Sequence, residues 1–175
     1  MKNDLNYFSL WRTLPISVIA MAWYDKNFKH DLIFNSNKAI KNFMDIESEN
    51  IKFIIVENTK EITHFSIPFR DEKSYSLSDK EIEEKLNYGV KDYEYKYCLS
   101  KDIIIKYYND YNFKMSLITN PNDTLNIKDK KIYIHENSEY YSYLVLPYNK
   151  WQNLNYSIDK LESLLLQDFK ANILS

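Results

Sequence analysis

The feature that most constrains this 175-residue sequence is an internal repeat. Residues 23–40 and 108–125 align without a gap and are identical at eight positions. Chance agreement in a chain of this composition would be about one or two, so the repeat predicts two copies of one supersecondary unit. The identical pairs are Asp25/Asp110, Asn27/Asn112, Phe28/Phe113, Lys29/Lys114, Leu32/Leu117, Ile33/Ile118, Asn35/Asn120 and Asn37/Asn122.

A second block recurs in the same order. Residues 53–68 and 132–147 each contain Glu-Asn followed by Thr or Ser, then an apolar alternation. A proline, Pro68 or Pro147, follows nine residues after the Thr or Ser. The ordered recurrence of both blocks favours a duplicated unit over two unrelated amphipathic helices.

Each copy is predicted to be a helix followed by two strands. Apolar residues at three- and four-residue steps predict one amphipathic helix from Pro15 to Ile33, and the same pattern recurs before Asn120-Pro121. Short apolar runs on either side of each Glu-Asn-Thr/Ser turn predict a strand pair, with Glu57 and Glu136 inside the turns. The expected strands are 53–56 and 62–67 in copy one, and 132–135 and 141–146 in copy two.

The predicted fold class is α+β, with helices packed on small antiparallel β-ribbons in two degenerate helix-strand-strand repeats. One domain, 1–175, accounts for the whole chain. In the insert, Ser78 to Glu81 forms a capping box for a short acidic helix. The expected segments are repeat one at 16–68, an insert at 69–102, repeat two at 103–147 and a closing helix at 156–170.

Composition excludes several classes of function. Gly89 is the sole glycine, so the glycine-rich phosphate loops of nucleotide-binding proteins are absent. The net charge is −2 and basic residues are mixed with acidic ones, so no nucleic-acid partner is expected. The apolar stretch 14–23 is about half the length that spans a bilayer, so we expect no membrane partner. Without signal-peptide features, the expected location is the cytoplasm.

Residues 18–32 and 54–68 resemble the nitrile hydratase α-subunit family, and equally the nitrile-hydratase-type leader peptides of ribosomal natural-product precursors. The likeness covers about residues 16–175, apart from much of the insert. Residues 132–147 are similar to the family's late strand pair, which ends in a Val-Leu-Pro turn, and 156–174 to its closing helix. In the first copy the motif residues are Ala22-Trp23, Asp25, Phe28-Lys29 and Asn58-Thr59.

The resemblance implies a Cys-x-x-Cys-Ser-Cys claw after the strand 62–67, holding an iron or cobalt ion that acts as a Lewis acid. Here Pro68, Phe69 and Arg70 take that position and bring no sulfur. The chain's single cysteine, Cys98, cannot form a cysteine cluster or an intramolecular disulfide. We therefore predict no metal, no cofactor and no catalytic residues of the family's type.

Other candidate site residues have weaker patterns. His30 is expected to be exposed on its helix. His64 and His135 occupy non-equivalent positions of the repeat, so a shared metal site is disfavoured. Tyr93, Tyr95 and Tyr97 alternate with charged residues, which favours packing on the core or a sheet edge; the alternative is a protein-binding surface.

The leading hypothesis is a non-catalytic nitrile-hydratase-α-like protein that acts by binding another protein. Its partner would be a β-subunit-like chain, a peptide-maturation enzyme, or a second copy of itself. One alternative is a ribosomal peptide precursor or leader, although no Gly-Gly or Gly-Ala cleavage site is present. A second alternative is an enzyme with an active site unlike the family's.

Overall fold

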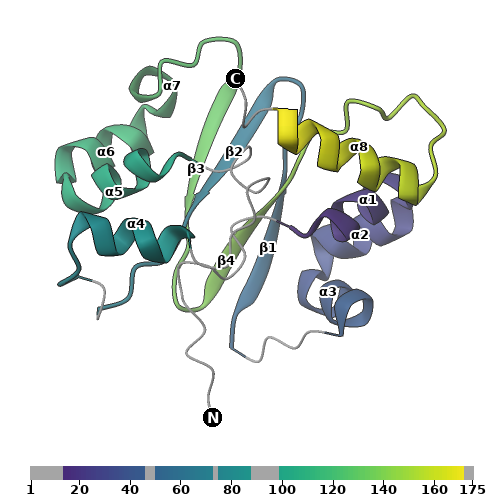
Figure 1. The fold of residues 1–175 in the computed structure, drawn as a ribbon, viewed down its shortest axis with the longest axis horizontal. Helices are drawn as coiled ribbons and strands as arrows, with labels where there is room; N and C mark the ends of the chain where they lie inside the picture. The colour runs from purple at the N-terminus through teal and green to yellow at the C-terminus, as the bar shows by residue number, and fades with distance from the viewer. Residues whose placement is uncertain (1–13, 46–49, 73–74, 88–98, 172–175) are drawn as a thin grey trace.

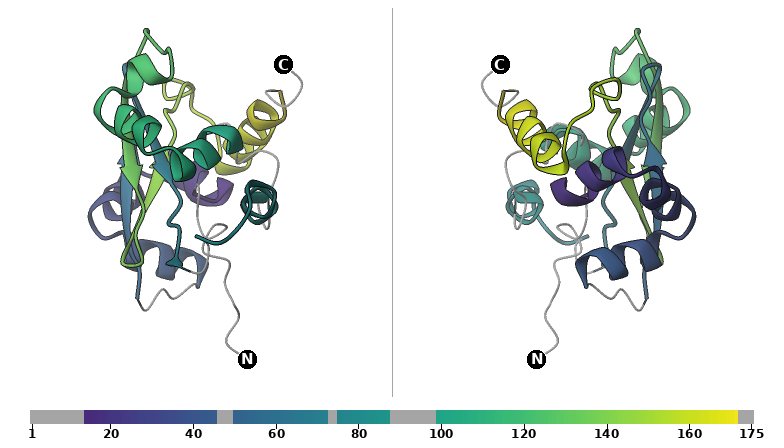
Figure 2. Two further views of the ribbon diagram at one scale, coloured as in Figure 1. Left: turned by 90° about the vertical axis from the view of Figure 1, so that its left-hand side faces the viewer. Right: turned by 90° about the vertical axis from the view of Figure 1, so that its right-hand side faces the viewer.

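Two groups of helices flank four central strands (Figure 1). The computed structural model describes residues 14–45, 50–72, 75–87 and 99–171. In the side views of Figure 2 the strands stand as one upright layer beside the helices. One group is α1 (Ile16–Tyr24), α2 (Lys26–Phe34), α3 (Ser36–Met44) and α8 (Ile158–Ala171). The other is α4 (Asp79–Asn87), α5 (Lys101–Asn109), α6 (Tyr111–Thr119) and α7 (Pro121–Thr124).

Each helical group buries its own apolar core. Leu32 of α2 lies in the first core and its repeat equivalent, Leu117 of α6, lies in the second; both are 0% exposed. The internal repeat therefore places the same residue type at the centre of two separate cores, as burial of the apolar face of each helix requires. Among the described helices, none is long and apolar enough to cross a membrane.

The strands pair between the repeats and not within them. They are β1 (Lys52–Glu57), β2 (Ile62–Ile67), β3 (Lys131–Glu136) and β4 (Tyr141–Leu146). β1 pairs with β4 and β2 pairs with β3, both in parallel, so the predicted antiparallel ribbons are wrong. The short links after β1 and after β3 each carry the chain from one sheet to the other. Parallel pairing needs long crossover connections, and α4 to α7 supply the one between β2 and β3.

The two ladders share one register. Lys52 lies opposite Tyr141, and their repeat equivalents, Lys131 and Ile62, lie opposite each other in the second sheet. The same correspondence holds along the full length of both ladders. The repeat thus has a pseudo-twofold relation in space, in which each copy supplies one strand to each sheet.

The expected single helix of each copy is divided at an aspartate that is identical in the two copies. Asp25 ends α1, and its carboxylate accepts hydrogen bonds from the backbone N–H groups of Asn27 and Phe28 in the first turn of α2. Asp110 does the same for Phe113 at the start of α6. An aspartate that satisfies these otherwise unpaired N–H groups starts a new helix, so the prediction of one continuous helix was wrong.

Asparagines that are identical in the two copies bond the starts of the strands to the helices. The Asn37 side chain donates to the Ile51 carbonyl oxygen at 2.7 Å and accepts from the Phe53 N–H at 2.9 Å. Asn122 accepts in the same way from the Ile132 N–H at 3.0 Å, and its amide donates to the carbonyl oxygen of Lys130 at 2.5 Å. These bonds satisfy main-chain groups where β1 and β3 begin.

A second repeated asparagine stabilises the turn between the two strands of each copy. Asn58 accepts from the His64 N–H at 2.7 Å, and Asn137 accepts from the Tyr143 N–H at 2.8 Å.

Within the insert, the predicted capping box is confirmed, because Ser78 and Glu81 exchange hydrogen bonds at the start of α4.

Candidate functional site

The segment after β2, where the resemblance places metal ligands, is organised around a buried arginine. Arg70 is 9% exposed. Its Nη1 donates to the Tyr108 carbonyl oxygen and to Asn109 Oδ1, both at 3.3 Å, and its Nη2 donates to the Tyr75 carbonyl oxygen at 3.4 Å. The guanidinium carbon also lies 5.0 Å from the centre of the Tyr75 ring and 5.2 Å from that of Tyr108. The segment is therefore tied to α5 by a fixed cation.

These residues do not fit the family's metal ion. Pro68 offers no N–H and no side-chain donor atom, and its carbonyl oxygen accepts a hydrogen bond from the Tyr108 hydroxyl at 2.6 Å. A guanidinium has no lone pair to give to a metal and repels a second cation. Within the described ranges there is also no group of three or more His, Cys, Asp or Glu residues arranged to hold a metal.

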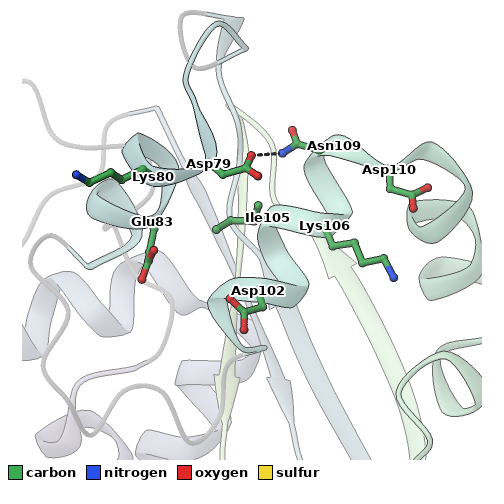
Figure 3. A pocket seen from close by; sticks show the side chains of 8 residues that line it. All are labelled: Asp79, Lys80, Glu83, Asp102, Ile105, Lys106, Asn109 and Asp110. Atoms are coloured by element: carbon green, nitrogen blue, oxygen red, sulfur yellow. Dashed lines mark hydrogen bonds between the residues drawn. The ribbon is translucent and has the colours of Figure 1, made fainter.

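A hollow of about 530 Å³ lies between α4 and α5 (Figure 3). Its walls mix acidic and basic side chains, and several of these already have local partners. Asn109 donates to Asp79 at 2.5 Å and so links the arginine to α4, while Glu83 is paired with Lys101 at 2.9 Å. The lining residues are Asp79, Lys80, Glu83, Asp102, Ile105, Lys106, Asn109 and Asp110.

The two repeated glutamates form ion pairs and are not turn residues, which corrects the prediction for Glu57 and Glu136. Glu57 ends β1 and pairs with Lys29 of α2; Glu136 ends β3 and pairs with Lys114 of α6 at 2.8 Å. Glu136 also accepts from the hydroxyl of Tyr107. Burial acts to raise the pKa of Glu136, but the hydrogen bonds from Lys114 and Tyr107 outweigh it and lower this pKa. Burial and the neighbouring carboxylate raise the pKa of Tyr107.

His64 and His135 lie side by side, contrary to the expectation from their non-equivalent repeat positions. Nδ1 of His64 is 2.8 Å from Nε2 of His135. The reason is the parallel pairing: residues of β2 and β3 that are diagonal neighbours on one sheet face come from different repeats. Burial lowers the pKa of His64, and burial together with the positive field of His64 lowers the pKa of His135.

Other predicted positions have mixed outcomes. His30 is exposed on α2, as predicted. Tyr93, Tyr95, Tyr97 and Cys98 lie outside the described residues. The arginine network was missed because its partners on α5 follow no motif. One signal was available: Tyr108 is the repeat equivalent of Trp23, and each bonds to the carbonyl oxygen of the proline that follows a strand.

Solved structures of known proteins resemble this fold, although their sequences differ from this chain. No protein-family profile and no curated protein sequence matches the chain. The structure is similar to a chain of a double mutant of Fe-type nitrile hydratase from Comamonas testosteroni Ni1, with a TM-score of 0.53 and 17% identity over 85% of this chain. A mutant of thiocyanate hydrolase gives a TM-score of 0.49 and 12% identity over 84% of this chain.

In both comparisons the match spans 65% of the solved chain, so this protein corresponds to part of the length of each. At these identities the likeness concerns the fold. The chain thus has an α+β fold that resembles a nitrile hydratase subunit.

Proposed function

We propose that this chain is a non-catalytic protein of nitrile-hydratase-like fold that acts by binding another protein. The observation that carries the proposal is Arg70, a hydrogen-bonded guanidinium in the segment where the resemblance puts metal ligands. A cation fixed there opposes metal binding by charge and provides no donor atom. The scaffold then lacks the family's Lewis acid and keeps surfaces for a partner.

An exposed apolar row on α6 supports a protein partner. Tyr111, Met115 and Ile118 are 72%, 40% and 36% exposed. Their spacing of four and three residues puts them on one face of the helix. Stable subunit interfaces are more apolar than transient ones, so the row favours a β-subunit-like chain over a peptide-maturation enzyme that binds briefly.

The binding proposal is tested by titrating the full chain with the purified product of each neighbouring gene, measured by size-exclusion chromatography with light scattering. We expect one stable complex whose dissociation constant rises at least about tenfold when Tyr111 and Met115 are both changed to Ser. Tyr140→Ser is the matched control, because Tyr140 is also exposed, at 61%, but lies in the turn between β3 and β4. Equal weakening by the control, or no complex with any product, would contradict the proposal.

The non-catalytic part is tested separately. The chain is expressed with added iron or cobalt and assayed for metal content and for hydration of a small nitrile. We expect no stoichiometric metal and no turnover. Nitrile hydration by the purified chain would refute this part, and a shortened or modified chain in the native host would favour the peptide-precursor alternative.

A further inference from the structure

The His64–His135 pair belongs to neither the arginine network nor the apolar row, and its geometry is that of a hydrogen bond between two rings. The facing nitrogens are 2.8 Å apart, within hydrogen-bond distance. The ring centres are 5.1 Å apart. This distance exceeds the separation of the facing nitrogens by about two imidazole ring radii, as expected when each nitrogen points at the other ring. The nitrogens therefore meet tip to tip.

A bond of this kind fixes how many protons the pair can accept. One ring must donate an N–H and the other must present a lone pair. A first added proton goes to the outer nitrogen of the donating ring, which leaves the bond intact and makes it charge-assisted. A second proton must enter at the facing lone pair, which sets two N–H groups and two positive charges against each other. The first proton is tolerated and the second breaks the contact.

The pair is part of an aromatic row that connects the two sheets. Tyr133 of β3 stacks on His64 with ring centres 5.3 Å apart, and Tyr143 stacks on His135 at 4.7 Å. His64 and His135 belong to the sheet of β2 and β3, whereas Tyr143 belongs to β4 in the other sheet. Movement of the histidine rings would therefore disturb the stacking of His135 on Tyr143, which joins the two sheets.

The charges around the aromatic row also oppose protonation of the histidine pair. Lys131 of β3 lies with its Nζ 4.8 Å from the centre of the Tyr133 ring, and its positive charge opposes protonation of the pair. β1 contributes Ile54, an uncharged residue, opposite Tyr143. In the described part of the chain, His30 has a carboxylate within 4 Å, whereas His64 and His135 have none to offset added charge.

We propose that His64 and His135 form an acid-sensitive junction that holds one shared proton at neutral pH and opens the contact between the two sheets when both rings become charged. The inference is independent of the proposed partner binding. The lowered pKa values of both histidines agree with it, because folding then disfavours proton uptake. The pair therefore contributes to the free energy of unfolding above pH 6.5, the ordinary pKa of histidine, and this contribution is lost as the pH falls below that value.

The test compares the pH dependence of urea unfolding for the wild-type chain, His135→Gln and the control His30→Gln. Gln can keep a hydrogen bond to His64 but cannot titrate. Between pH 6.5 and 4.5 we expect the unfolding equilibrium constant of the wild type and of His30→Gln to rise more steeply than that of His135→Gln, by up to about tenfold per pH unit. Equal slopes in all three proteins would overturn the proposal.

A second measurement on the unmodified chain keeps the proposal testable if His135→Gln does not fold. Nitrogen-15 spectra of the histidine rings at pH 7.5 report which ring nitrogens carry protons. We expect a proton on one of the two facing nitrogens and none on the other. Two unprotonated facing nitrogens would overturn the assignment, and so would stoichiometric zinc binding that is lost in His135→Gln and kept in His30→Gln.

Discussion

The indole Nε1–H of Trp23 donates a hydrogen bond to the carbonyl oxygen of Pro147, 3.1 Å away and 124 residues along the chain. In the other half the hydroxyl of Tyr108 donates to the carbonyl oxygen of Pro68 at 2.6 Å. Each aromatic residue lies in a helix of one repeat, and each proline follows a strand that pairs with the other repeat. The two bonds thus fix the ends of β4 and β2 to the helices.

These bonds predict matched losses of stability. Tyr108→Phe removes only the hydroxyl, and we expect it to lower the free energy of unfolding by about 1–2 kcal/mol, since the buried Pro68 carbonyl loses its partner. Trp23→Phe should cost somewhat more, because the smaller ring also loses contact with Trp151, whose ring centre is 5.8 Å away. Urea unfolding measures both. Tyr24→Phe, at an exposed position, is the control and should stay within about 0.5 kcal/mol.

The repeated asparagines at the strand starts predict a second pair of equivalent losses of stability. Asn37→Ala and Asn122→Ala each leave a main-chain N–H at a buried strand residue without its acceptor, at a cost of about 1–3 kcal/mol. Asn27→Ala is the matched control, because Asn27 is also repeated but is exposed on α2. Thermal unfolding should show similar losses for the first two variants and little change for the third. A neutral Asn37→Ala would contradict this role.

Substitutions of Arg70 should separate the effect of its positive charge from that of its planar hydrogen-bonding shape. Arg70→Lys keeps the positive charge but cannot reach Tyr108, Asn109 and Tyr75 with one planar group. We expect Arg70→Lys to lower the free energy of unfolding by about 1–3 kcal/mol, and Arg70→Met to lower it by at least as much. If Lys were fully tolerated in a denaturation experiment, the fork-shaped hydrogen bonding would not be what holds the segment.

The Lys114–Glu136 pair predicts a pH-dependent loss. Because its pKa is lowered in the folded chain, Glu136 contributes stability above its unfolded pKa, near 4.5, and this contribution disappears as the pH falls further. Lys114→Met should therefore cost about 0.5–1 kcal/mol at pH 7, a modest value for a partly exposed pair, and less at pH 3. Lys130→Met, at an exposed position, is the control. A loss that is equal at both pH values would show that packing, not charge, is responsible.

Local chemistry in the sequence was enough for much of the secondary structure. Three kinds of prediction depended only on neighbouring residues and were confirmed. They are the capping box of Ser78, the start of a helix after Pro15, and the ends of strands before Pro68 and Pro147. The repeated Asp25 and Asp110 also carried a local signal, since aspartate is a preferred N-cap, but the continuous apolar periodicity obscured it.

The sequence by itself determined that this chain has two copies of one unit, and the motifs in those copies indicated a nitrile-hydratase-like fold that the structural comparison supports. Only the tertiary structure decided which strands pair. A short link between β1 and β2 is compatible both with a hairpin and with a change of sheet, and the choice depends on burying two separate helical cores. The contact of His64 with His135 follows from that pairing, because these residues lie on β2 and β3. The contacts of Arg70 with α5 also depend on the tertiary structure, because they join residues far apart in the chain.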